Sequence, residues 1–254
     1  MKATQECVLA TRYLSERPLG TRYSQLGTSL RITEIYKSVQ GESSFTGLPC
    51  IFVRLTGCNL RCSWCDSEYT FTGGNAMSLD EVMAEVRALA PVRLVEITGG
   101  EPMLQEHEVV PLMQRLIAEG YTVLLETSGE RPLGSVPKEI HKIVDVKCPG
   151  SGEGGTFHLD NLLALGCRDE VKFVIADRAD YEFARDFTRQ HGLDERVASV
   201  IFSPAFRKDA TGRSAENALL DPRELVEWVL ADGLNVRLGL QMHKFVWDAA
   251  EKGV

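Results

Sequence analysis

Short apolar runs rich in β-branched residues recur along the chain from Arg31 onward, and polar or amphipathic stretches separate them. Runs of this length, bounded by turn-forming residues, are typical of β-strands. The pattern predicts strands at 32–36, 51–55, 94–98, 122–126, 143–146, 171–175, 200–202 and 236–240.

Between several of these runs, the apolar residues follow the period of an amphipathic helix. The stretch 78–89 opens with a capping box, in which Ser78 is followed three residues later by Glu81. Helices are also expected at 108–119 and 180–191, each followed by a glycine, and at 222–231, where Asp221 is the N-cap and Pro222 the first helical residue. This alternation predicts an α/β fold with a mostly parallel sheet, open or closed into a barrel.

Residues 1–30 follow neither period, so we expect a loosely ordered N-terminal extension before a single domain over 31–254. The chain of 254 residues is 44% hydrophobic and 25% charged, as in ordinary globular proteins. A core of this size needs neither disulfides nor a structural metal. The cysteines therefore require another explanation.

Charge and hydropathy exclude several classes of partner. The formal net charge is −8 and no lysine- and arginine-rich run is present, which argues against binding nucleic acid. No apolar segment approaches the length of a membrane span, and the N-terminus lacks the apolar core of a secretory signal. We expect a cytoplasmic protein that binds neither nucleic acid nor membrane.

Three of the seven cysteines, Cys58, Cys62 and Cys65, follow the strand at 51–55 with C-x₃-C-x₂-C spacing. Thiolates on one loop can converge on one centre, and they select zinc, Cu(I) or iron–sulfur. A structural zinc site usually takes cysteines in two pairs, and no second C-x₂-C is present. A [4Fe–4S] cluster on three thiolates keeps one iron open to a small molecule. Zinc completed by a distant His or Cys, and three unligated cysteines, remain alternatives.

Polar groups also follow other expected strands, at 99–100, 126–129, 145–147 and 203–204. Because functional groups of a parallel barrel collect at the carboxyl ends of its strands, we expect these groups and the cysteine loop to face one mouth. The segment 150–155 matches G-x-G-x-x-G, but Cys148 and Pro149 precede it and no clear helix follows, so we expect a flexible loop rather than a dinucleotide site. We expect Cys148 and Cys167 to be buried thiols, and four histidines to lie on the surface: His107, His141, His158 and His191.

The cysteine triplet, with Trp64 before its last cysteine, resembles the radical S-adenosylmethionine (SAM) superfamily. The segment Gly99-Gly100-Glu101-Pro102 is similar to the GGEP motif of that superfamily. The resemblance implies an open, partial parallel β/α barrel, a [4Fe–4S] cluster on the three cysteines, and SAM on the fourth iron. It also implies that the glycines bring the backbone close to the amino group of SAM.

Within that superfamily, the Q-G-E segment at 40–42, the segments T-G-L-P at 46–49 and C-D-S at 65–67, and Q-M-H-K at 241–244 are similar to the 7-carboxy-7-deazaguanine synthase family. The resemblance implies a lyase that contracts the ring of 6-carboxy-5,6,7,8-tetrahydropterin and releases ammonia, on the route to queuosine and other deazapurines. It also implies Mg²⁺, a one-electron donor such as flavodoxin or ferredoxin, and a homodimer.

The same resemblance assigns roles to individual residues. Arg54 would pair with the pterin carboxylate, and Ser67 would be a ligand of Mg²⁺. The other substrate contacts would be Val39, Gln40, Gly41, Glu42, Thr98, Gln241 and His243. The cofactor would contact Trp64, Cys65, Asp66, Gly99, Gly100, Glu101, Asp145, Lys147 and Ser203.

Each role has a structural alternative. Arg54 could be an ion-pair partner on its strand, Ser67 a turn hydroxyl, and Asp145 and Lys147 a salt-bridged strand end. Two other functions also stay open at this point, a glycyl-radical activating enzyme with a protein substrate and a non-enzymatic zinc module. The chain continues beyond the Q-M-H-K segment to Val254, which leaves any role of its C-terminus undecided.

Overall fold

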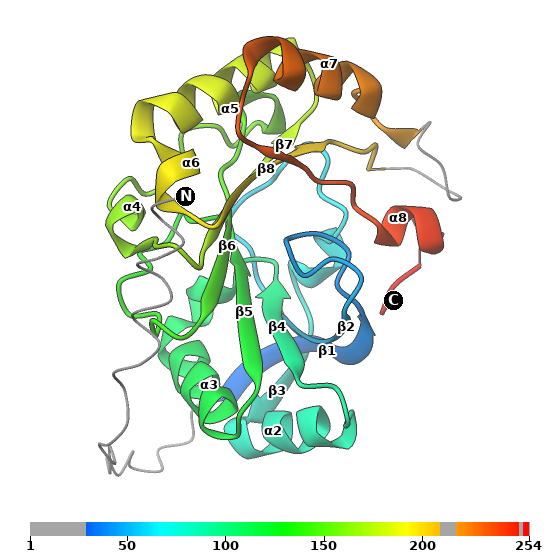
Figure 1. Ribbon diagram of the computed structural model, residues 1–254. Helices are drawn as coiled ribbons and strands as arrows, with labels where there is room; N and C mark the ends of the chain where they lie inside the picture. The colour runs from blue at the N-terminus through cyan, green and yellow to red at the C-terminus, as the bar shows by residue number, and fades with distance from the viewer. Residues whose placement is uncertain (1–28, 209–216, 249–250, 254) are drawn as a thin grey trace.

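The computed structural model describes residues 29–208, 217–248 and 251–253, and these contain one nine-stranded sheet (Figure 1). The apolar runs form its strands, because branched and aromatic side chains pack well on a pleated surface. The strands are β1 (Ser29–Val39), β2 (Pro49–Leu55), β3 (Asn75–Ser78), β4 (Leu94–Gly99), β5 (Thr122–Thr127), β6 (His141–Asp145), β7 (Glu170–Ile175), β8 (Ser199–Pro204) and β9 (Arg237–Leu238).

The strand order is β3-β1-β2-β4-β5-β6-β7-β8-β9. All neighbours from β2 to β9 are parallel, whereas β1 is antiparallel to both β2 and β3. Strands β3 and β9 end this order and do not pair with each other, so the sheet is open. This confirms the expected open, partial parallel β/α barrel.

The predicted helices form with the caps that the sequence indicates. Ser78 accepts a hydrogen bond from the backbone of Glu81, whose side chain bonds back to the backbone of Ser78. Asp221 caps its helix by accepting from the backbone N–H of Arg223, 2.8 Å away. The helices are α2 (Leu79–Ala88), α3 (Glu106–Ala118), α4 (Asn161–Ala164), α5 (Arg178–His191), α6 (Leu193–Arg196), α7 (Pro222–Asp232) and α8 (His243–Val246), with 3₁₀ turns η2 (Glu68–Thr70), η3 (Pro102–Gln105) and η4 (Pro149–Ser151).

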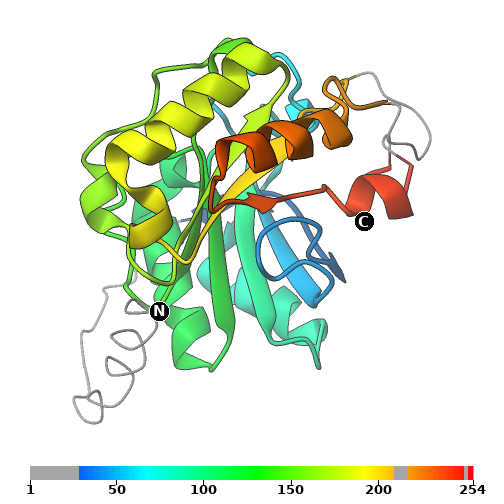
Figure 2. The same ribbon diagram turned by 45° about the horizontal axis from the view of Figure 1, so that its top comes forward.

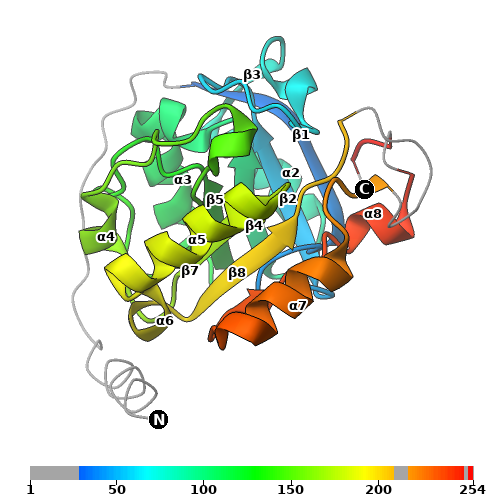
Figure 3. The ribbon, with the colours of Figure 1, turned by 90° about the horizontal axis from the view of Figure 1, so that it is seen from above.

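The two faces of the sheet have different neighbours because side chains alternate along each strand. On one face, α2, α3, α5 and α7 cover the sheet (Figures 2 and 3). Val53, Ile97 and Phe173 of the strands belong to the main core, which also includes buried residues of these helices. On the other face, a small apolar cluster lies toward the start of the parallel strands, formed by Cys50, Phe52, Leu94, Leu124 and Ile143. Toward the carboxyl ends of the strands, the residues on that face are polar, such as Thr98, Glu126 and Asp145.

Some expectations differ from the structure in extent. Strand β1 includes Ser29 and Leu30, so the ordered sheet starts before Arg31; the rest of the expected N-terminal extension lies outside the described residues. Strand β3 was not expected, because Asn75–Ser78 shows no apolar alternation; its pairing with β1 supplies the stabilisation. The 150–155 segment, expected as a flexible loop, begins in the 3₁₀ turn η4 and packs against the cysteine loop.

Two single residues are also placed differently from expectation. Cys148 is buried as predicted, but Cys167 is exposed, because it lies in the turn before β7 rather than in the core. His141 is not a surface residue: its side chain is 15% exposed and its Nε2 lies 2.9 Å from Glu170 Oε1. Among the described residues, no helix has the length and apolar character required to cross a bilayer.

Candidate active site

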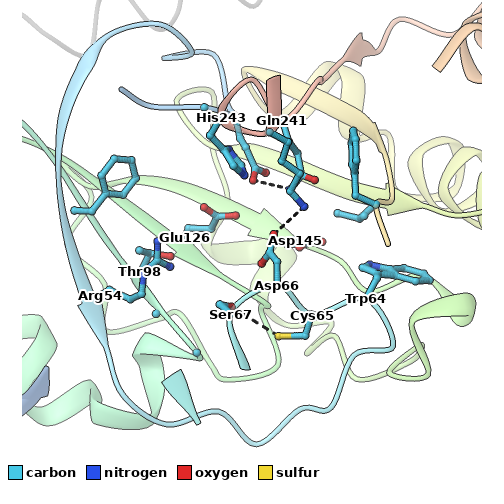
Figure 4. Close-up of a pocket in the computed structure, with 18 of the residues that line it drawn as sticks. Arg54, Trp64, Cys65, Asp66, Ser67, Thr98, Glu126, Asp145, Gln241 and His243 are labelled. Carbon is cyan, nitrogen blue, oxygen red and sulfur yellow. Dashed lines mark hydrogen bonds and ion pairs between the residues drawn. The ribbon is translucent and has the colours of Figure 1, made fainter. Parts of the chain in front are cut away.

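A cavity of about 570 Å³ lies where the parallel strands end, on the face of the sheet that the outer helices leave uncovered. Figure 4 shows Gln241 and His243 on one side of it and the loop with Cys65 on the other, with Glu126 and Asp145 between them. The residues predicted for the site line this cavity, with two exceptions, Glu101 and Ser203. Four of the five polar groups expected at one mouth therefore converge, as barrel geometry requires, whereas the group at 203–204 does not line the cavity.

The cysteine loop is anchored by the loop around η4. Ser63 N–H donates to the carbonyl of Ser151 at 2.8 Å, and Arg61 N–H donates to Glu153 Oε1 at 2.5 Å. All three cysteines of the triplet line the cavity. Burial raises the pKa of the Cys62 thiol to about 11, so this ligand would lose its proton when it binds a metal.

The two glycines of the GGEP segment allow the β4 end to contact the cysteine loop. A Cβ on Gly100 would lie 2.3 Å from the carbonyl oxygen of Gly57 and 2.7 Å from Cys58 Cβ. Gly99 has φ of +151°, and a Cβ there would meet the backbone of Leu55 at 2.4 Å. Both glycines therefore lie against the backbone of neighbouring segments, where a side chain would not fit. Both also line the cavity.

Glu101 has a different position from the one the resemblance implies. Its carboxylate is fully buried, outside the cavity, and accepts hydrogen bonds from Met103 N, Thr127 Oγ1, Ser128 N and Ser128 Oγ at 2.6–3.0 Å. These donors occupy both carboxylate oxygens. Glu101 therefore connects the end of β4 to the end of β5, and its side chain does not line the cavity.

Charged pairs line the part of the cavity next to the cysteine loop. Asp66 pairs with Lys244 at 2.8 Å, and this ammonium lowers the pKa of Asp66 although burial acts to raise it. Lys147 pairs with Asp145 Oδ2 at 2.7 Å, as the salt-bridge alternative supposed. The second oxygen, Asp145 Oδ1, is buried and has no hydrogen-bond partner among the described residues.

The Q-G-E and Q-M-H-K segments meet on the opposite side. Met242 N–H donates to the carbonyl of Gly41 at 2.8 Å, and a Cβ on Gly41 would lie 2.4 Å from His243 Nδ1. Glycine at position 41 thus allows the imidazole to lie against the backbone. Burial lowers the pKa of His243 although Glu42 and Asp66 act to raise it, so the ring is neutral at neutral pH.

Gln40 and Glu42 of the Q-G-E segment are both held by protein partners. Gln40 Nε2 donates to Glu96 Oε2 at 2.6 Å, and Gln40 Oε1 accepts from the backbone N–H of Glu42 at 2.5 Å. Glu42 Oε1 accepts from Gln241 Nε2 at 2.8 Å. The buried Gln40 therefore orients the Q-G-E segment. The carboxylate of Glu42 is half-buried and faces the cavity.

Three cavity residues were missed by the sequence reasoning as individual site residues: Glu96, Glu126 and Lys172. Each is a charged residue in a mostly apolar strand, on the same face as Thr98 and Asp145. Burial and the nearby Glu126 carboxylate raise the pKa of Glu96 well above its ordinary value. Trp247 and Lys252, beyond the Q-M-H-K segment, also line the cavity.

Arg54 and Ser67 lie in the cavity wall as predicted, and each already has a protein partner. Arg54 Nε lies 2.8 Å from Glu34 Oε1, so the ion-pair alternative describes part of its environment. Ser67 Oγ lies 3.7 Å from Cys65 Sγ and does not cap η2.

The donors present fit an iron–sulfur cluster with a chelating small molecule. Three thiol side chains line one cavity, and a buried carboxylate oxygen of Asp145 next to them lacks a partner, as expected of an atom that a ligand would satisfy. Within the described residues, no three His, Cys, Asp or Glu side chains are grouped to hold a single metal ion.

The open parallel sheet and the cysteine loop at its carboxyl edge define a radical SAM protein, and a profile of the Radical SAM superfamily matches residues 52–149. A Streptococcus suis SuiB structure with precursor peptide SuiA shares the fold, at TM-score 0.54 and 14% identity over 74% of this chain and 47% of that one.

Closer relatives give the family. The 7-carboxy-7-deazaguanine synthase of Koribacter versatilis is 70% identical over 89% of this chain and 100% of the relative. That of Chlorobaculum tepidum is 43% identical over 89% of this chain and 97% of its own. The crystal structure of QueE from Escherichia coli has a TM-score of 0.67 and 26% identity, covering 85% of this chain and 95% of that one. The chain belongs to the 7-carboxy-7-deazaguanine synthase family, which is a radical SAM lyase family with a [4Fe–4S] cluster.

Proposed function

We propose that this cavity converts 6-carboxy-5,6,7,8-tetrahydropterin to 7-carboxy-7-deazaguanine with release of ammonia. The observation that carries the proposal is the position of the cysteine triplet and the Q-G-E and Q-M-H-K segments on opposite sides of one cavity. A protein substrate, as in a glycyl-radical activating enzyme, would not require the charged pairs that line this cavity.

Cys58, Cys62 and Cys65 would hold the cluster, and Trp64, Asp66, Gly99, Gly100, Asp145 and Lys147 would surround SAM. When bound, the cluster and SAM would supply a one-electron reduction and a carbon-centred radical that removes hydrogen from the substrate. The chain itself binds and orients the pterin and excludes water. Ser203 is buried against Gly239, just after β9, so we assign it a packing role.

On the substrate side, Arg54 would bind the pterin carboxylate. Burial acts against its charge, but Tyr36, Tyr69 and Glu34 raise the pKa of Arg54, so the guanidinium stays charged. The carboxylates of Glu42 and Glu126 and the ring of His243 face the same space and can accept N–H groups from the pterin ring. Thr98 and Val39 complete the wall.

We propose Mg²⁺ as a further cofactor, with the Ser67 hydroxyl as its protein ligand. One hydroxyl is a weak ligand for a hard cation, so substrate oxygens and water would complete the shell. Loss of this ligand in Ser67→Ala should raise the Mg²⁺ concentration needed for half-maximal rate. An unchanged Mg²⁺ dependence would remove Ser67 from the assignment.

Three remaining expectations rest on family resemblance. We propose that flavodoxin or ferredoxin delivers the electron, that the protein is a homodimer, and that it acts in the cytoplasm, where thiols such as Cys50 and Cys148 stay reduced. Light scattering of the purified protein tests the dimer, and turnover with each reduced donor tests the reductant.

The whole proposal is tested by turnover. Protein reconstituted anaerobically with iron and sulfide should be brown and should form the deazaguanine product and ammonia in equal amounts from the tetrahydropterin and SAM. A colourless protein that binds one zinc and leaves SAM intact would overturn it.

A further inference from the structure

We propose that Lys172 is a positioning residue of this reaction: its ammonium holds Glu42 and Glu126 as hydrogen-bond acceptors aimed at the N–H groups of the substrate ring. The inference rests on the proposed function, because it requires a substrate with ring N–H donors. It concerns a residue that touches the two carboxylates rather than the reacting atoms.

Lys172 lies in β7, with its side chain on the cavity face and only 3% exposed. Its Nζ lies 2.6 Å from Glu42 Oε2, bonds Glu126 Oε1, and lies 3.8 Å from Asp145 Oδ2. The three carboxylates come from the segment after β1, the end of β5 and the end of β6. One ammonium therefore connects three parts of the chain that are distant in sequence.

A second buried lysine in the same sheet shows what a purely structural pair looks like. Lys142 in β6 is 5% exposed and pairs with one carboxylate, Asp169, at 3.0 Å. Neither residue lines the cavity. One carboxylate is thus enough to neutralise a buried lysine in this sheet. Lys172 pairs with three carboxylates, and all three line the cavity. This difference indicates that Lys172 positions groups for the ligand of the cavity.

The substrate explains why the chain should hold Glu42 as an ionised acceptor. A pterin ring presents N–H donors along its edge, and an ionised carboxylate only accepts hydrogen bonds. Glu42 accepts one bond from Lys172 and one from Gln241, and a carboxylate has about four acceptor positions. Acceptor capacity therefore remains for the ring.

Charge balance around Glu42 leads to the same role. Burial acts to raise the pKa of Glu42, but Lys172 and His243 lower it to about 2. Glu126, Asp145 and Glu96 also line this part of the cavity. Without Lys172, burial would favour a protonated Glu42, which can donate a hydrogen bond where the ring requires an acceptor.

The test compares Lys172→Met with Lys142→Met, since both remove a buried ammonium from neighbouring strands. Steady-state turnover is measured on cluster-loaded protein, together with thermal unfolding and iron content. For Lys172→Met we expect kcat/KM to fall on the order of 100-fold, mainly because KM rises. We also expect this KM to rise further as the pH is lowered. Lys142→Met should lower the melting temperature and leave kcat/KM unchanged.

A folded, iron-loaded Lys172→Met protein with wild-type KM and a wild-type pH profile would overturn the inference. An equal loss of kcat/KM in Lys142→Met would overturn it as well, because the effect would then follow from general destabilisation. An inactive wild-type protein would overturn the proposed function and this inference together, whereas an active wild type with an insensitive Lys172→Met overturns only the latter.

A second pair of variants keeps the test decisive if Lys172→Met does not fold. Glu126→Gln removes one of the three negative charges around Lys172. The double variant Lys172→Met/Glu126→Gln therefore has less uncompensated negative charge in the cavity wall than Lys172→Met alone. We expect the double variant to have a KM roughly tenfold above that of Glu126→Gln alone, because Glu42 still loses its partner. Equal KM values would contradict the inference.

Discussion

Glu34 and Arg54 lie directly opposite each other on the antiparallel strands β1 and β2, and Arg54 Nε is 2.8 Å from Glu34 Oε1. Arg54 also donates to the Tyr36 hydroxyl at 2.8 Å, and the Tyr69 hydroxyl donates to Glu34 at 2.8 Å. The guanidinium is therefore oriented before any ligand binds. An oriented guanidinium loses little side-chain entropy when it pairs with a carboxylate.

For Arg54→Ala we expect KM for the carboxytetrahydropterin to rise roughly 10–100-fold, because a charge-assisted hydrogen bond to the substrate is lost. Cluster content should stay unchanged. Arg115→Ala is the matched control, since Arg115 pairs with Asp80 at the surface, 2.6 Å away, and is remote from the cavity. If Arg54→Ala binds the pterin like the wild type, Arg54 acts only as a strand ion-pair partner.

Replacing any cysteine of the triplet by serine should abolish the iron–sulfur absorption, since hydroxyls are poor ligands for the cluster irons. SAM cleavage should fall below detection, as measured by 5′-deoxyadenosine formation. Cys167→Ser provides the control, because Cys167 is exposed and outside the cavity. Normal absorption in Cys62→Ser would remove that residue from the ligand set.

Gly41→Ala should weaken substrate binding with little loss of stability. The added Cβ would meet His243 Nδ1 at 2.4 Å, so the imidazole must move away from its position in the cavity wall. We expect KM to rise about tenfold, in kinetics compared with Gly134→Ala, where a Cβ meets nothing within 4 Å. Equal kinetics of the two variants would show that the position of His243 is unimportant.

Glu101→Gln should lower the free energy of unfolding by about 2 kcal/mol, because an amide N–H₂ would face donors that now bond the buried carboxylate. Denaturant unfolding of the protein measures the loss. Glu85→Gln on the exposed side of α2 should cause none. Normal stability combined with lost SAM binding would instead assign Glu101 to the cofactor, as the family resemblance implied.

The stability of the protein should fall as pH is lowered from about 4.5 to about 2. The pKa of Glu42 is lowered from 4.5 to about 2, because Lys172 and His243 outweigh the effect of burial. A carboxyl with a lowered pKa stabilises the folded state above its unfolded-state pKa, and this contribution is lost as pH falls through the folded-state value. Glu42→Gln should flatten the pH dependence in this range; an unchanged slope would place the titration elsewhere.

Much of the fold could be predicted because its determinants are local. The capping box at Ser78, the Asp221 N-cap and the β-branched runs depend on neighbours within a few residues, and these elements form as expected. Strand β3 could not be predicted in this way, since it is stabilised by pairing with β1, which lies outside its own sequence window.

Motif resemblance singled out the cysteine loop, the Gly99–Gly100 turn and the Q-G-E and Q-M-H-K segments, because each is a short stretch of consecutive residues, and all of them line the cavity. Solvent exposure of single residues was less predictable. Cys167 was expected in the core and is exposed, whereas His141 was expected at the surface and is largely buried. The burial of both residues depends on packing against strands and turns that are distant in the sequence.

The sequence by itself determined the class of chemistry, because the cysteine triplet and the GGEP segment are short local motifs that resemble the radical SAM superfamily. Only the tertiary structure decided which charged groups share the cavity. Glu96, Glu126 and Lys172 lie on three strands that are far apart in the chain, and sheet register brings them to one face. The structure also directs Glu101 away from that cavity. These placements follow from strand pairing across the sheet, which no local pattern encodes.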